Sequence, residues 1–139
     1  MSPLQIESEA AHNRRRSQRQ NVGFYLNQII DDAPLRSFTT DLSAIGLYME
    51  RPAGPLDRRS HTIQLEIPLP GAGETLWARG EVVYDRFDAL FHGTAVRFTA
   101  MARRHQRMLR DWLHQTRRST RFALHNPFRA EIVIHRPTA

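Results

Sequence analysis

Six short segments with strand-type alternation follow one another before any helical periodicity begins, and this order most constrains the fold. Apolar and polar residues alternate between turn signals in segments at 22–27, 35–40, 47–50, 61–67, 75–84 and 93–99. No helical segment lies between them to carry the crossover that parallel neighbours require. The sequence therefore predicts an antiparallel sheet built strand after strand.

Turn residues separate these segments. The run Asp31–Pro34 is predicted to break the chain after the first strand, and residues 85–90 are predicted to form a turn before the last strand. Asp85 and Asp88 are interpreted as solvated turn residues rather than as a catalytic pair of carboxylates.

The pattern changes at Met101, where apolar residues take helical spacing up to residue 113 and the arginines fall on the opposite side. We expect an amphipathic helix over 101–118 whose apolar stripe covers the open end of the β structure. The predicted fold class is mainly β: a six-stranded antiparallel β-barrel closed by a C-terminal amphipathic α-helix.

A chain of 139 residues has room for one domain with tails. The expected division is a flexible N-terminal arm at 1–20, a barrel with its closing helix at 21–118, and a C-terminal extension at 119–139. A short strand at 129–135 is predicted within that extension.

The 20 basic residues exceed the 14 acidic ones, which gives a formal net charge of +6. All the basic residues are arginines, and seven of them lie within 101–121 beside one acid, Asp111. Such clusters indicate an anionic partner or a solvated helix face. The absence of lysine weakens the first interpretation, because a preference for arginine codons would also produce it.

Composition excludes several other classes. The chain has no cysteine, which excludes disulfides and cysteine chemistry. It has no apolar run long enough to span a membrane and no apolar signal-peptide core, so we expect a cytoplasmic protein. Its seven histidines lack metal-ligand spacing, and no catalytic motif is present. We therefore expect no catalytic residue, no metal and no cofactor, and hence no enzyme.

Two short elements carry more information. Arg15-x-x-x-Arg19 precedes the first strand, and Asp41-x-Ser43-x-x-Gly46 forms a turn between two strands. Arginines four residues apart can clamp phosphates or donate to the acceptor edge of guanine. A carboxylate can accept from the guanine ring N–H and amino group. A serine can cap the turn or donate to a phosphate, and a glycine permits positive φ and close backbone approach.

In this order, the two elements resemble the signature of the PilZ domain, the bacterial receptor family for cyclic di-GMP. The strand at Gly80–Tyr84 and the segment Gly93–Phe98 are similar to later strands of that family, and the 101–118 helix is similar to its C-terminal helix. The resemblance covers roughly residues 12–118. It implies a receptor on a six-stranded barrel, with a ligand-induced switch that signals to an unnamed protein partner.

The resemblance also implies residue roles. Arg15 and Arg19 would lie on a flexible loop that closes over the ligand, Asp41 and Ser43 would lie on the barrel surface and hold a guanine edge, and Gly46 would let the turn approach. Arg14 and Arg16 flank Arg15 and complete the expected binding set. In this family, an arginine directly before the first element accompanies binding of two intercalated cyclic di-GMP molecules, so two ligands per chain are expected.

Two alternatives stay open at this point. A small barrel with a basic helix could bind single-stranded nucleic acid, which needs exposed aromatic side chains on the strands; Tyr25, Tyr48 and Trp77 lie opposite the expected core residues. A PilZ-like adaptor could instead bind only protein. The intact Arg and Asp/Ser elements argue against this adaptor, and a nucleic-acid polymer is not the expected partner.

Overall fold

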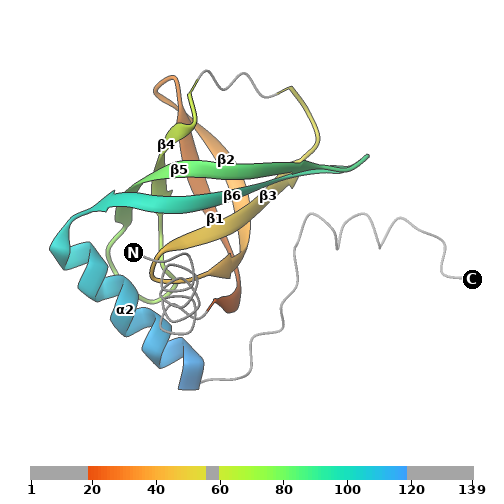
Figure 1. The fold of residues 1–139 in the computed structure, drawn as a ribbon. Coiled ribbons are helices and arrows are strands. Elements are labelled where there is room, and N and C mark those ends of the chain that lie inside the picture. The colour runs from red at the N-terminus through yellow and green to blue at the C-terminus, as the bar shows by residue number, and fades with distance from the viewer. Residues whose placement is uncertain (1–18, 56–59, 119–139) are drawn as a thin grey trace, which may run out of the picture.

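The computed structural model describes residues 19–55 and 60–118. Within them the strands close into an antiparallel barrel in the order β1-β2-β3-β6-β5-β4, with β1 pairing with β4 to complete the circle (Figure 1). The strands are β1 (Gln20–Ile30), β2 (Ala33–Leu42), β3 (Gly46–Pro52), β4 (Thr62–Ile67), β5 (Leu76–Phe87) and β6 (Phe91–Met101). One helix, α2 (Arg103–Arg118), follows them in this part of the chain. The predicted fold class is confirmed.

The bounds of the elements differ from the sequence prediction, and the difference has a clear structural reason at three places. The break at Asp31–Pro34 is only a two-residue turn, because Asp31 and Asp32 both adopt positive φ and Ala33 already pairs with Ile30. The turn predicted at 85–90 shrinks to 88–90, because β5 continues to Phe87. The helix begins at Arg103 rather than Met101, since Met101 still pairs with β5 as the last residue of β6.

Helix α2 closes one end of the barrel, at the lower left in Figure 1. Leu109, Trp112 and Leu113 are buried and join the barrel core. Trp112 packs edge-to-face on Phe24, with ring centroids 5.7 Å apart, and its indole Nε1–H donates to the Pro70 carbonyl at 2.8 Å. The apolar stripe expected on this helix therefore does cover the barrel end.

In the described part of the chain, no helix combines the length and the apolar character that crossing a bilayer requires. Several expectations concern residues outside the described ranges: Arg14, Arg15 and Arg16, nearly all of the arm at 1–20, the extension at 119–139, and the strand at 129–135.

Candidate functional site

A β-bulge in β2 decides where Asp41 points. The pairing of β2 with β3 shifts register between Thr39 and Asp41, which leaves Thr40 as the extra residue. Strict alternation from Thr39, which is fully buried, would turn Asp41 inward and Leu42 outward. The bulge reverses both, so Leu42 enters the core at 0% exposure and the Asp41 side chain lies on the outer surface at 23% exposure.

The hydroxyl of Thr39 holds this bulge. Its Oγ1 donates to the Tyr48 carbonyl at 2.8 Å and lies 3.2 Å from the Asp41 carbonyl. Both acceptors belong to the backbone at the register shift, where regular ladder bonds are interrupted. Thr39 therefore positions Asp41 without facing the surface itself, and the sequence analysis did not identify it.

Asp41 is joined to the arginine that the sequence pairs with it. The Arg19 guanidinium Nη1 donates to Asp41 Oδ2 at 3.0 Å across a separation of 22 residues. The Arg19 side chain is 62% exposed. The second carboxylate oxygen, Asp41 Oδ1, is buried and has no hydrogen-bond partner among residues 19–55 and 60–118. Near the start of β1, the Arg19 guanidinium therefore lies beside a carboxylate, that of Asp41, of which only one oxygen is hydrogen-bonded.

Ser43 lies in the turn between β2 and β3 and is only 1% exposed. Its hydroxyl accepts from the Ile45 amide at 3.2 Å and donates to the Gly46 carbonyl at 3.3 Å, while its own amide donates to the same carbonyl at 2.8 Å. The expected surface position of Ser43 is therefore wrong for this state. Its side chain is used in building the turn.

Position 46 requires a glycine because the backbone of β6 comes very close to it. Its own dihedral angles do not require one, because its φ is not positive. An added Cβ would overlap the carbonyl oxygen of Val96 on β6. The approach expected of Gly46 is therefore toward the neighbouring strand, and it fixes the turn against β6. A hydrogen bond also joins the turn to β6, because the Phe98 amide donates to the Ile45 carbonyl at 2.7 Å.

Gln20, the first residue of β1, is hydrogen-bonded to helix α2. It follows Arg19 directly, and its side-chain Nε2 donates to the Leu113 carbonyl of α2 at 2.9 Å. A groove of about 200 Å³ lies beside the turn, between Ile45, the end of β6 and α2 residues Leu109 and Arg110. Arg19 and Gln20, the turn and the helix therefore meet in one region of the molecule.

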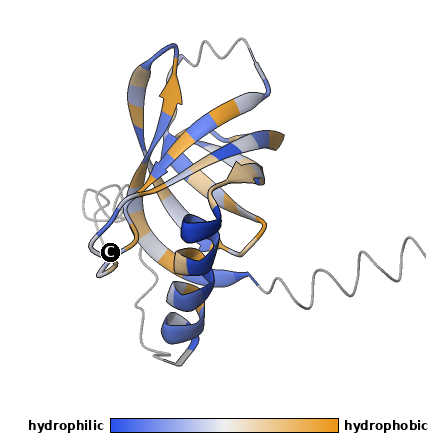
Figure 2. Ribbon diagram, turned by 90° about the vertical axis from the view of Figure 1, so that its left-hand side faces the viewer, coloured by the Kyte–Doolittle hydropathy of each residue, from blue (hydrophilic) through white to orange (hydrophobic). Residues whose placement is uncertain are grey.

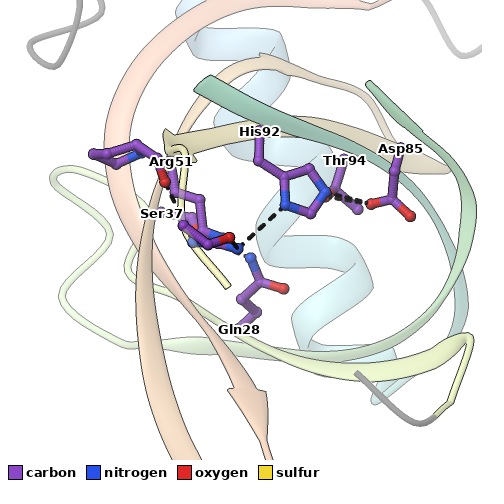
Figure 3. A network of polar contacts seen from close by, with 8 residues as sticks. Gln28, Ser37, Arg51, Asp85, His92 and Thr94 are labelled. Atoms are coloured by element: carbon purple, nitrogen blue, oxygen red, sulfur yellow. Dashed lines mark hydrogen bonds and ion pairs between the residues drawn. The ribbon is translucent and has the colours of Figure 1, made fainter. Parts of the chain in front are cut away.

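A second polar cluster lies inside the barrel (Figure 3). His92 is buried and central to it: its Nε2 lies 2.8 Å from Asp85 Oδ1, and its Nδ1 lies 3.3 Å from the Arg51 guanidinium. Because an arginine can only donate, Nδ1 accepts, which leaves Nε2 as the protonated nitrogen that donates to Asp85. Thr94 donates to the same Asp85 oxygen at 2.9 Å.

Asp85 is thus a structural acceptor within β5, which corrects its interpretation as a solvated turn residue. Asp88 does lie in the turn, where its carboxylate accepts from the amides of Leu90 and Phe91. Across the described residues, His, Asp and Glu side chains form no group of three or more that could hold a metal ion.

The sequence matches the PilZ domain family over residues 13–115. That match spans well over half of the chain. The chain belongs to the PilZ domain family. It therefore shares the family with receptor domains, and the match includes both elements singled out in the sequence. Comparison with curated protein sequences finds no relative.

Solved PilZ structures share the fold. The inhibitor of motility MotI/DgrA from Bacillus subtilis superposes with a TM-score of 0.66 at 16% identity, covering 78% of this chain and 53% of that protein. The PilZ domain of YcgR from Escherichia coli, solved with c-di-GMP, gives a TM-score of 0.61 at 20% identity, covering 78% of this chain and 95% of that domain. This chain therefore spans about half of MotI but nearly the whole of an isolated PilZ domain.

Proposed function

We propose that this PilZ chain is a cyclic di-GMP receptor whose site is built around Arg19 and Asp41. The observation that carries the proposal is the contact between these two side chains, together with the unpartnered Oδ1 of Asp41. A buried acceptor without a partner is unfavourable, so a ligand donor that reaches it gains a well-placed hydrogen bond. The c-di-GMP complex of the YcgR PilZ domain supports the choice of ligand.

The chemistry of the ligand fits these groups. Guanine presents a ring N–H and an amino group side by side, which suit the two oxygens of one carboxylate. Its opposite edge presents two acceptors that suit an arginine fork. The phosphates attract the remaining arginines of the first element. We therefore assign Asp41 to the donor edge of guanine, and Arg15 and Arg19 to its acceptor edge and the phosphates, with Arg16 beside them.

Ser43 and Gly46 enter this site as builders of the turn. The Ser43 hydroxyl is already bonded within the turn, and Gly46 holds the turn against β6. Both fix the backbone that carries Asp41. Arg14 belongs to a second, intercalated ligand molecule, whose additional phosphates give a further arginine an acceptor, so we propose two ligands per chain.

Ligand binding is proposed to act as a switch. Arg19 must exchange its contact with Asp41 for contacts with the ligand, which orders the arm against the barrel. Gln20 is the next residue and is bonded to α2, so movement of the arm reaches the helix directly. The receptor would then signal through a protein partner in the cytoplasm.

The aromatic side chains weigh against the nucleic-acid alternative. Trp77 is exposed at 41%, but the Tyr25 ring lies under the Arg36 guanidinium, 3.7 Å from its centroid, and packs on Phe38. Tyr48 packs beside Tyr84. The Tyr25 and Tyr48 rings are thus engaged with neighbouring side chains, so of the three rings predicted to stack on bases only Trp77 is exposed.

Calorimetric titration of the intact chain tests the proposal. We expect saturable binding of cyclic di-GMP at a ratio near two, and at least tenfold weaker binding to GMP, which offers the same base and a phosphate without the cyclic pair. Tighter binding of a 20-mer single-stranded DNA with a steep salt dependence would instead support the nucleic-acid barrel. Absence of binding to either would favour a protein-only adaptor.

A further inference from the structure

The outward face of α2 carries a row of arginines that the cyclic di-GMP site does not use. Four of them follow a 4-3-7 spacing, with His114 in the same row. We call this row the arginine stripe; it consists of Arg103, Arg107, Arg110 and Arg117. At 3.6 residues per turn these positions fall within an arc of about 80° and extend over about 21 Å. All four side chains are exposed, and most of the helix is hydrophilic in Figure 2.

The first three members of the arginine stripe work against the stability of their own helix. Arg103 and Arg107 are four residues apart and Arg107 and Arg110 are three apart, so like charges face each other along the row. The first turn of α2 has no acidic residue and instead carries Arg103 and Arg104 at the positive end of the helix dipole. Packing of the apolar face does not require this arrangement.

Two other exposed arginines near the barrel end or on the helix do have acidic neighbours. Arg97 pairs with Glu81, and Arg104, which lies beside the stripe, pairs with Glu74. In the described part of the chain, no ion pair joins a member of the stripe to an acid. Asp111 lies four residues after Arg107, yet the two are not paired. Among the described residues, no acidic side chain therefore compensates the charge of the stripe.

The straight row of charges and its surroundings favour one class of partner over a membrane or a nucleic acid. A membrane surface would need apolar side chains beside the charges, but the apolar face of α2 is buried against the barrel. Single-stranded nucleic acid would need exposed rings, whereas the aromatic residue of the helix, Trp112, is buried. A second helix lying alongside α2 would present acidic residues at the same alternating spacing of three and four.

We propose that the arginine stripe of α2 binds an acidic helix of a partner protein. Charge complementarity over a straight row sets both recognition and orientation. This inference goes beyond the receptor function and does not depend on it, because it would hold even if the chain bound no cyclic di-GMP.

A designed peptide provides the test. The probe is a fluorescent 22-residue helical peptide with glutamates at 4-3-4-3 spacing, and its comparator has the same composition with the glutamates distributed around the helix. Fluorescence anisotropy with the full chain at physiological ionic strength should show at least fivefold tighter binding of the matched peptide. Equal binding of the two peptides would overturn the proposal, because charge alone would then explain it.

Two triple variants locate the binding surface. R103A/R107A/R117A should weaken matched-peptide binding at least tenfold. R36A/R79A/R86A removes the same charge from exposed strand positions and should change binding less than twofold. Equal losses in the two variants, or retained affinity in the first, would exclude the stripe, as would tighter binding of a 20-mer single-stranded DNA that displaces the peptide.

The same variants test the physical argument by thermal unfolding. Removing Arg103 and Arg107 relieves repulsion between like charges and takes a cation from the positive end of the helix dipole, which offsets the loss of Arg117 from the last turn. R103A/R107A/R117A should therefore unfold at the same temperature as the unmodified chain or at a higher one. A lower unfolding temperature would show that these arginines stabilise the domain, and would remove the reason for inferring a partner.

Discussion

Asp41 and Asp85 have nearly the same exposure, yet they have opposite surroundings. Their side chains are 23% and 21% exposed. Each follows a β-bulge in its own strand, at Thr39/Asp41 in β2 and at Val82/Tyr84 in β5. The first bulge turns its aspartate outward to an exposed arginine, whereas the second turns its aspartate inward to a buried histidine and a threonine.

The difference shows that exposure alone does not identify a binding carboxylate. Asp85 Oδ1 accepts from two protein donors, so its charge is already used in holding β5 against β6. Asp41 has one exposed partner and one oxygen that has none among the described residues. The hydrogen-bond inventory therefore separates an aspartate that holds two strands together from one whose hydrogen-bonding capacity is only partly used, as the proposed site requires.

The largest effect is expected from Asp85→Ala. This change leaves the buried Nε2–H of His92 and the Thr94 hydroxyl without their acceptor, and each such group costs about 1–3 kcal/mol. The free energy of unfolding, measured with urea, should fall accordingly, while the affinity for cyclic di-GMP should change less than about threefold. Unchanged stability would contradict the structural role assigned to Asp85.

Asp41→Asn should give the reverse result. The amide removes the charge and presents N–H groups to guanine donors, so affinity for cyclic di-GMP should fall at least tenfold, which corresponds to about 1.4 kcal/mol. Stability should change by less than about 1 kcal/mol, because the ion pair that is lost is exposed on the arginine side. Calorimetry and urea unfolding of one preparation provide both values. Full-affinity binding would remove Asp41 from the site.

The Asp41 half of this contrast could be predicted from the sequence, but the role of Asp85 was predicted wrongly and neither bulge was recognised. The two spaced elements placed Arg19 and Asp41 in one site, and the alternating segments gave the barrel. The positions of the bulges had signals that could have been used. Two polar residues, Thr40 and Asp41, precede the apolar Leu42, and three apolar residues run consecutively at Val82–Tyr84, so strict alternation fails at both places.

The remaining misses come from tertiary contacts that have no local signature. Gln20 reaches α2 across 93 residues, and His92 meets Arg51 across 41. Serine in a turn fits either a cap or a surface donor, and only the geometry shows that Ser43 is buried in the turn. Such pairings depend on the register of the closed barrel, which composition and periodicity do not specify.

A smaller effect is expected from Thr39→Val, which keeps the shape of the side chain but removes the hydroxyl that holds the β2 bulge. Loss of the hydrogen bond to the Tyr48 carbonyl should lower stability by about 1 kcal/mol. Because Asp41 is then less firmly positioned, cyclic di-GMP should bind a few-fold more weakly. Thr62→Val at an exposed position of β4 is the matched control and should alter neither quantity.

The smallest change in binding free energy is expected from Arg14→Leu, which tests whether a second ligand molecule binds beside the one at Asp41. The first ligand should bind with little change, while the calorimetric ratio should fall from near two toward one. A ratio of one in the unmodified chain would remove Arg14 from the site and leave the assignment of Arg19 and Asp41 intact.

The most direct test of the account is a nuclear magnetic resonance titration of the isotope-labelled chain with cyclic di-GMP. We expect the backbone amides of Asp41–Gly46 to shift strongly on binding, while those of Asp85 and of His92–Thr94 stay in place. Ligand binding that shifts the Asp85 and His92 amides and leaves the Asp41–Gly46 turn unchanged would contradict it.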